Sequence, residues 1–366
     1  MQTPTWLFLL LLALRGAPGP VQLEVPDPAF GQRLDWAQTQ LSSVLLCTSA
    51  TTCDDVVINT LAMNALGRFD LARPALVRAP ERTPLWVLGS YDYWIASGDD
   101  AFVREQWAFI TQTLDPATAR QAAHDGGVLL GAANGVIDMA RTRQDSAALL
   151  SARALASDAE RRAQQQPGIF GPVLRLLNDD LEEAHLDLIA DSVHPRWPLA
   201  TGFVALALYR YHREAAGFAL LQGMAQKETS TPAMYVLPLL RGLVGWEVDA
   251  PRRAAGLEPH LPAAWNELSV QDLRVGSHLV DVEITRESGA YTIHLGKDSP
   301  SPLSLRVSPA LPAGARVTSV LVNDADQPVQ LETNEHDTHV VIEVSLRRAM
   351  NIEIEYELPA KRPSRP

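Results

Sequence analysis

The chain has 366 residues, 46% of them hydrophobic and 20% charged, a composition typical of a folded protein with room for more than one domain. Its formal net charge is −12 and no basic stripe runs along it, which argues against nucleic acid or an anionic membrane as a partner. An acidic surface suits a neutral sugar ligand, but it equally suits simple solubility.

The N-terminal end carries an unbroken apolar run over residues 6–14, followed by Arg15 and by glycines, alanine and prolines up to residue 20. The run is too short to cross a bilayer as a helix, so we expect no stable membrane span. Its small-residue flank is typical of a signal peptide, although no Lys or Arg precedes it. We expect residues 1–20 to be a signal peptide and the protein to be exported to the periplasm or beyond. A buried first helix, or a gene start inside a longer coding sequence, is the alternative.

The chain has two cysteines, Cys47 and Cys53, which lie close together. In an exported protein their natural pairing is a local disulfide, whereas in a reducing compartment they would be two free thiols. Because no second pair of ligands lies nearby in the sequence, we expect no metal site there.

Apolar residues recur at helical spacing from about residue 32 to 245, with prolines marking the breaks. Segment counting gives about ten to twelve helices joined by short connections. Residues 203–209 are apolar on nearly every side, which predicts an inner helix buried on both sides. So many paired antiparallel helices favour a helical bundle, solenoid or toroid.

After Pro262 the period changes to two, with turn residues between short segments. This pattern predicts an antiparallel β-sandwich. The expected strands cover residues 268–270, 273–275, 278–285, 291–295, 303–307, 317–322, 339–344 and 352–356. Residues 359–366, rich in proline and basic residues, are expected to be a disordered tail.

Four stretches occur in one order: Thr-Pro-Leu-Trp at 83–86 with Ser-Gly-Asp-Asp-Ala-Phe at 97–102, Thr-Gly-Phe-Val-Ala-Leu at 201–206, Pro-Leu-Leu-Arg-Gly-Leu-Val-Gly-Trp-Glu at 238–247, and Leu-Glu-Pro-His-Leu-Pro-Ala-Ala-Trp at 257–265. Together they resemble the bacterial glycogen-debranching (amylo-1,6-glucosidase-like) six-hairpin glycosidases. The resemblance covers most of residues 32 to about 325. It implies a shortened (α/α) six-hairpin toroid over residues 30–255, followed by the β-sandwich over residues 256–358.

Glycoside hydrolysis needs two carboxyl groups across the sugar, one protonated and one ionised. In the family these lie on long loops at one mouth of the barrel, and here the loops are short. The resemblance places Glu81 before the Thr-Pro-Leu-Trp turn, where the family has an Asp, as the proposed general acid. Glu228 is the only acid in the shortened loop before the last helix, which makes it the candidate second carboxylate. Asp55 matches a sugar-binding Asp, but Asp54 stands where the family has Arg.

Each candidate has a structural alternative. Asp54 and Asp55 suit the first turn of a helix, where the dipole favours acids, and Glu81 could pair with Arg78 or Arg82 at a helix start. Glu228 beside Lys227 could be a solvated loop residue. Two further candidates are aromatic: Trp86 and Trp197 could stack on a sugar, yet at helical spacing aromatic residues more often pack a core.

No phosphate-binding loop, Gly-x-Ser-x-Gly elbow or metal-ligand spacing of histidines appears, so we expect no cofactor and no acyl hydrolysis. Two functions stay open. The first is a glycoside hydrolase of carbohydrate metabolism, acting on an α-glucan or related oligosaccharide. The second is a non-catalytic, carbohydrate-binding or degenerate family member, which the missing loops favour. Another toroid chemistry, polysaccharide lyase action, is a distant third, because no Tyr/His or Arg cluster for it can be assembled.

Overall fold

The computed structural model describes residues 19–43, 53–115, 126–165, 198–226, 231–312, 314–333 and 336–358. It divides into two compact units. The β unit comprises residues 1–35 and 243–366, and the helical unit comprises residues 36–242. The helical unit thus ends at Gly242, before the boundary at 255 expected from the sequence, and the N-terminal segment belongs with the strands.

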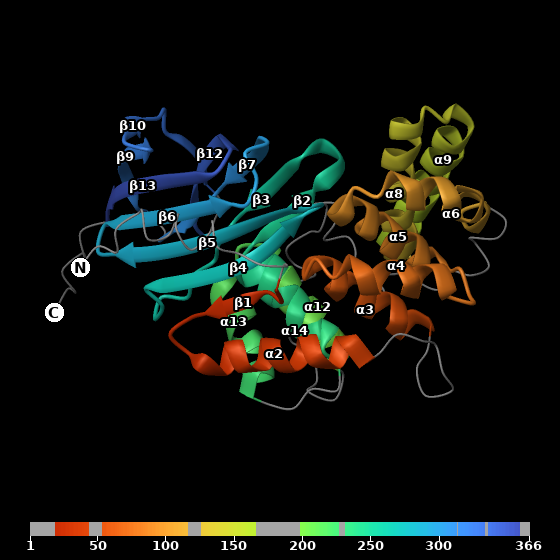
Figure 1. Ribbon diagram of the computed structural model, residues 1–366, viewed down its shortest axis with the longest axis horizontal. Coiled ribbons are helices and arrows are strands. Elements are labelled where there is room, and N and C mark those ends of the chain that lie inside the picture. The colour runs from red at the N-terminus through yellow and green to blue at the C-terminus, as the bar shows by residue number, and fades with distance from the viewer. Residues whose placement is uncertain are drawn as a thin grey trace. The chain divides into compact units, whose positions relative to one another are not determined.

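The helical unit contains helices that mostly follow one another in the chain as hairpins (Figure 1). Helix α2 (Pro28–Ser43) crosses the boundary between the units. The others are α3 (Cys53–Ala65), α4 (Phe69–Arg78), α5 (Pro84–Ser97), α6 (Asp100–Thr113), α8 (Gly126–Arg143), α9 (Ser146–Gln165), α12 (Pro198–Arg210), α13 (Glu214–Gln226), α14 (Ala233–Leu237) and the π-helix η1 (Pro238–Leu243).

Local sequence signals set the limits of α5. Thr83 caps its N-terminus by accepting a hydrogen bond from the Trp86 amide, and Pro84 occupies the first turn, where the missing N–H is not needed. Gly98 ends the helix in the left-handed conformation, at φ +70°, which glycine adopts without strain. Asp99 then caps α6 by accepting from the Phe102 amide, so the α5–α6 turn is specified residue by residue.

Alternate helices pack on one another. Helix α3 packs on α5, α5 on α8, α14 on α3, and α12 on α14, while α4, α6, α9 and α13 each pair with a sequence neighbour. Most of α5 is buried, which fits a helix covered on several sides, whereas the partly exposed α6 buries one face. The coarse expectation of a helical part made of hairpins is therefore confirmed.

The β unit contains two sheets. The larger has the strand order β1-β4-β5-β6-β13-β9-β10 and the smaller the order β11-β12-β7-β3-β2, with β8 also paired to β12. Their bounds are β1 (Gln22–Glu24), β2 (Trp246–Asp249), β3 (Ala254–Leu257), β4 (Glu267–Val275), β5 (His278–Glu287), β6 (Ala290–Lys297), β7 (Leu303–Val307), β8 (Ala310–Leu311), β9 (Arg316–Val322), β10 (Ala325–Asp326), β11 (Gln330–Thr333), β12 (Thr338–Leu346) and β13 (Ala349–Glu357).

The smaller sheet corrects the expectation of a purely antiparallel sandwich, because β3 pairs with β7 in parallel. The hairpin of β2 and β3 covers residues 246–257, which the resemblance places at the end of the helical part and the start of the β-sandwich. Its two strands are short and join the sheet through β7, so the period-two signal there is too brief to detect. The remaining expected strands are present, and β4 through β6 form a continuous antiparallel meander.

Two contacts tie the ends of the β unit together. Strand β1 pairs with β4, and the Phe30 ring meets the Trp265 ring edge-on at 5.0 Å between centroids.

Gly245 directly precedes β2 and has φ +66°, and a Cβ atom at this position would lie 1.8 Å from the carbonyl oxygen of Glu258. Glycine is therefore required at this position both by the backbone angle and by the close approach.

Candidate functional site at the helix N-termini

The candidate carboxylates of the helical unit lie at the starts of two packed helices. Asp54 and Asp55 occupy the first turn of α3, and Glu81 lies in the loop between α4 and α5. Helices α3 and α5 are separated by one antiparallel helix, α4, and pack on each other, so their N-termini lie at the same end. Residues 26 positions apart in the sequence are thereby brought into one acidic cluster, defined as Asp54, Asp55 and Glu81.

The three carboxylates influence one another electrostatically. Burial raises the pKa of Asp54, and the negative charges of Asp55 and Glu81 raise it further. Glu81 is exposed and Asp55 is half-buried, whereas Asp54 is exposed as a residue but has a partly desolvated carboxyl group. A carboxyl whose ionised form is disfavoured by neighbouring acids is the kind of group that can hold a proton for a leaving oxygen.

Glu81 does not make the ion pair that the structural alternative expected. Among the described residues it pairs with neither Arg78 nor Arg82. The Arg82 guanidinium instead lies over the ring of Phe109, 3.8 Å from its centroid, and 5.4 Å from that of Trp86. Arg82 thus packs on aromatic rings of α5 and α6 and does not neutralise the charge of Glu81.

Trp86 is a core residue, which corrects its expected role in stacking on a sugar. The side chain is fully buried, and its Nε1–H donates to the carbonyl oxygen of Leu76 at 2.9 Å. The indole links α5 to the end of α4 and presents no exposed face. The helical spacing that suggested a sugar platform reflects interior packing here.

Four expected site residues lie outside the described residues, in whole or in side chain. Glu228, Trp197 and Cys47 fall outside the described ranges. Cys53 begins α3, but its side chain is also outside them, so the disulfide with Cys47 stays a prediction. Asp54 is the residue that sequence reasoning undervalued, since it was weighed only as a helix-start acid. The family resemblance marks its position, but Asp54 and Glu81 are 27 positions apart in the sequence, and that spacing does not reveal their electrostatic interaction.

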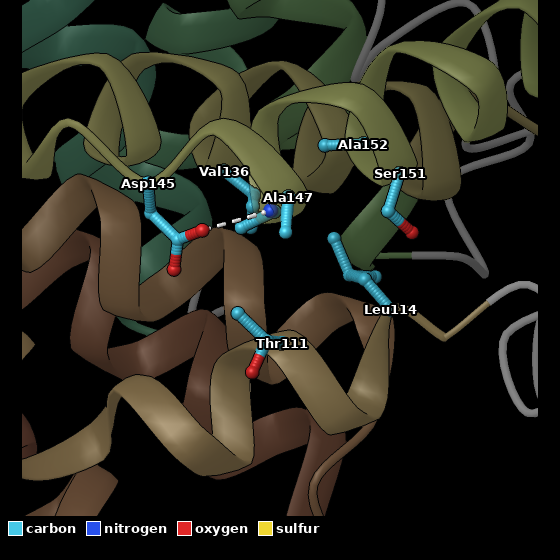
Figure 2. A pocket seen from close by; sticks show the side chains of 8 residues that line it. Thr111, Leu114, Val136, Asp145, Ala147, Ser151 and Ala152 are labelled. Atoms are coloured by element: carbon cyan, nitrogen blue, oxygen red, sulfur yellow. Dashed lines mark hydrogen bonds between the residues drawn. The ribbon is translucent and has the colours of Figure 1, made fainter.

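A hollow of about 260 Å³ lies between α6, α8 and α9, away from the acidic cluster in sequence (Figure 2). Its lining is mostly aliphatic or hydroxylated: Thr111, Leu114, Val136, Asp145, Ala147, Ala148, Ser151 and Ala152. The Asp145 carboxylate accepts from the Ala148 amide and the Trp107 indole, both at 3.0 Å, and these bonds lower its pKa. Asp145 is therefore committed to capping α9. The hollow is also smaller than the roughly 300–1,000 Å³ of usual ligand pockets.

The β unit holds a buried histidine whose two ring nitrogens each lie close to an oxygen atom. His339 Nε2 lies 3.0 Å from Asp337 Oδ2, and Nδ1 lies 3.0 Å from the Ser308 carbonyl oxygen. Burial lowers the pKa of His339, but the bonds to Asp337 and Ser308, with the charges of Asp337 and Glu258, raise it to about 9. The carboxylate of Asp337 and the carbonyl of Ser308 therefore favour the protonated, cationic form of this buried histidine.

The similarity of the chain to known proteins is confined to its fold. No protein-family model and no curated protein matches it. Among solved structures, an α-L-rhamnosidase from Dictyoglumus thermophilum matches with a TM-score of 0.66 and 13% identity, over 92% of this chain and 50% of the rhamnosidase. A sialidase matches with a TM-score of 0.57 and 10% identity, over 73% of this chain and 38% of the sialidase.

These identities are low enough that the likeness shows the fold alone, and the chain spans half or less of the length of both enzymes. The coarse architecture expected from the sequence, helical hairpins followed by β-sheets, is confirmed. Within the described residues, none of the helices combines the length and apolar character that a bilayer crossing requires.

Proposed function

We propose that the chain is a carbohydrate-active protein of the six-hairpin glycosidase type, with hydrolytic activity on an α-glucan or related oligosaccharide. The observation that carries the proposal is the acidic cluster at the starts of α3 and α5. The fold that the chain shares with a rhamnosidase and a sialidase supports a carbohydrate as the substrate. The resemblance to the debranching-type glycosidases adds the α-glucan as substrate.

In this proposal Glu81 donates the proton to the glycosidic oxygen, because the family resemblance assigns it that role and it lies exposed in the loop before α5. Asp55 accepts hydrogen bonds from sugar hydroxyls. Asp54, whose pKa is raised by burial and by the charges of Asp55 and Glu81, is a neighbouring carboxyl that can hold a proton. Glu228 is the proposed second carboxylate, acting on water or on the anomeric carbon.

The test is hydrolysis of maltooligosaccharides and a panel of aryl glycosides by the full chain, beside Glu81→Gln and Asp55→Asn. Loss of a general acid lowers turnover by roughly 10²- to 10⁴-fold, so Glu81→Gln should lose at least about 100-fold in kcat. Asp55→Asn should act mainly on KM. Glu160→Gln, at an exposed position of α9 in the same unit, is the matched control and should retain activity.

The outcomes separate the two functions that the sequence leaves open. Sugar binding without turnover, equal in the wild type and in Glu81→Gln, would support the non-catalytic carbohydrate-binding member. The burial of Trp86 removes one expected stacking surface from both functions and does not favour either. Neither binding nor turnover with any sugar in the panel would refute both.

Export belongs to the same proposal. The apolar run at residues 6–14 would direct the chain out of the cytoplasm and be cleaved near residue 20. N-terminal sequencing of the protein from its native host tests the cleavage. Mass spectrometry of the non-reduced peptide containing Cys47 and Cys53 tests the disulfide, and two free thiols in that peptide would contradict it.

A further inference from the structure

Lys297 is a buried lysine without a carboxylate partner. It is the last residue of β6, is 3% exposed, and donates from Nζ to the carbonyl oxygen of Ser299. Among the described residues it forms no ion pair. The next residue, Asp298, directs Oδ1 to the Leu279 amide at 3.1 Å. A buried ammonium is disfavoured unless a negative charge compensates it, and the nearby charge of Asp298 offsets the effect of burial on Lys297 only in part.

A chain of hydroxyl and imidazole groups follows Lys297. The Ser301 Oγ lies 3.2 Å from His278 Nε2 and 3.3 Å from the Ser299 Oγ. The β5–β6 register sets this arrangement, because Val280 pairs with Lys297 and therefore places His278, at the start of β5, beside the turn after β6. In the turn from residue 298 to 302, a proline follows each of the two serines and restricts the backbone.

The electrostatics of this cluster are those of an unneutralised positive site. Burial lowers the pKa of His278, the charge of Lys297 lowers it further, Asp298 opposes this, and Arg253 adds to the lowering. Burial also lowers the pKa of Lys297, against a smaller opposite effect of Asp298. Both cationic forms are disfavoured, and the single carboxylate nearby does not offset the two effects. A bound anion would favour both.

We propose that Lys297, His278 and Ser301 form a binding site for a tetrahedral oxyanion, the phosphate or sulfate group of a small ligand. The ammonium supplies charge, the serine hydroxyl donates a hydrogen bond, and the imidazole donates a second when protonated. The exposed Arg253 adds long-range attraction at the rim. The site lies within the β unit and does not depend on the proposed glycosidase activity.

The test is isothermal titration of the full chain with inorganic phosphate and, in a second arm, inorganic sulfate, at ionic strength held constant with NaCl. We expect saturable binding. Lys297→Met should weaken it at least about tenfold, because a charged hydrogen-bond partner is lost, and Ser301→Ala should weaken it severalfold. Arg316→Gln is the matched control, because it removes a surface cation of the same unit that is paired with Glu357 at 2.7 Å. It should bind as the wild type does.

Thermal unfolding provides a second readout. Phosphate should raise the unfolding temperature of the wild type and of Arg316→Gln, but not that of Lys297→Met. Methionine has a similar length without the buried charge, so this variant should fold; if it does not, Ser301→Ala and His278→Gln carry the test. No saturable binding by the wild type, or undiminished binding by the substituted site, would overturn the proposal.

Discussion

Arg241 and Asp92 form an ion pair in the interior of the helical unit, with 2.7 Å between Arg Nη2 and Asp Oδ1 and side-chain exposures of 13% and 10%. The other carboxylate oxygen of Asp92 accepts from Asn64 Nδ2 at 2.8 Å. One carboxylate therefore joins three segments: α5, the C-terminal end of α3, and the π-helix η1. Since such helix irregularities need compensating contacts, this ion pair holds η1 in place.

Removing one partner of this pair should destabilise the helical unit. Arg241→Met leaves the Asp92 charge buried without its guanidinium, which typically costs about 3–5 kcal/mol. The expected result is a lower free energy of unfolding in urea, monitored by circular dichroism. Replacing both residues, as Asp92→Leu with Arg241→Met, should cost less than the sum of the two single changes.

The exposed pair of Arg161 with Asp158 on α9, at 3.3 Å, is the control for this experiment. Arg161→Gln should change the free energy of unfolding by less than about 1 kcal/mol, because solvent screens surface pairs. If Arg241→Met had the same free energy of unfolding as Arg161→Gln, the buried pair would not stabilise the helical unit.

Two helical glycines give a matched pair of opposite predictions. A Cβ atom on Gly202 of α12 would lie 2.3 Å from the carbonyl oxygen of Met234, in the contact with α14, whereas one on Gly223 of α13 meets nothing within 4 Å. Gly223→Ala should therefore stabilise by up to about 1 kcal/mol through helix propensity. Gly202→Ala should lower the melting temperature, since α12 and α14 would have to separate. Equal effects of both substitutions would contradict this account of the packing.

The sequence predicted period-based features well and contacts poorly. The strands of the meander from β4 to β6 have clear alternation, and α5 has a Thr83 cap and a terminal Gly98, so both were predictable. The parallel β3–β7 pairing and the placement of Gly245 against Glu258 depend on residues far apart in the chain, which no local period encodes. The acidic cluster falls between these cases. Each acid was visible at a helix start, but the packing of α3 on α5 brings them together.

His339 predicts a pH dependence of the β unit. Its folded pKa of about 9 lies above the ordinary value of 6.5, so the protonated form is favoured by folding. The resulting stabilisation is complete below about pH 6.5 and is lost as the pH rises through about 9. A shift of this size corresponds to at most about 3 kcal/mol. The measurement is the free energy of unfolding of the β unit between pH 6 and 10.

His339→Gln should remove this alkaline decline and lower stability at pH 6. His294→Gln, on β6 of the same unit, is the matched control and should leave the decline in place. A decline of the same size in His339→Gln would assign it to another group.

Asp54 predicts a loss of stability with rising pH, as His339 does, but in the acidic range. Its pKa is raised in the folded state by burial and by Asp55 and Glu81, so folding disfavours its ionised form. This cost is absent at a pH below the ordinary Asp value and is fully present above the raised value. Asp54→Asn should therefore stabilise the helical unit at pH 7, by roughly 0.5 kcal/mol as for a like-charge pair on a helix, and give no gain near pH 3.

Asp70→Asn tests the sign, since Asp70 also lies in the first turn of a helix but is paired with Arg68 at 3.0 Å. It should lose stability at pH 7, because both the helix dipole and the arginine favour its charge. If Asp54→Asn lost stability as Asp70→Asn does, Asp54 would be an ordinary helix-start acid, and the mutual repulsion that sets the acidic cluster apart would be refuted.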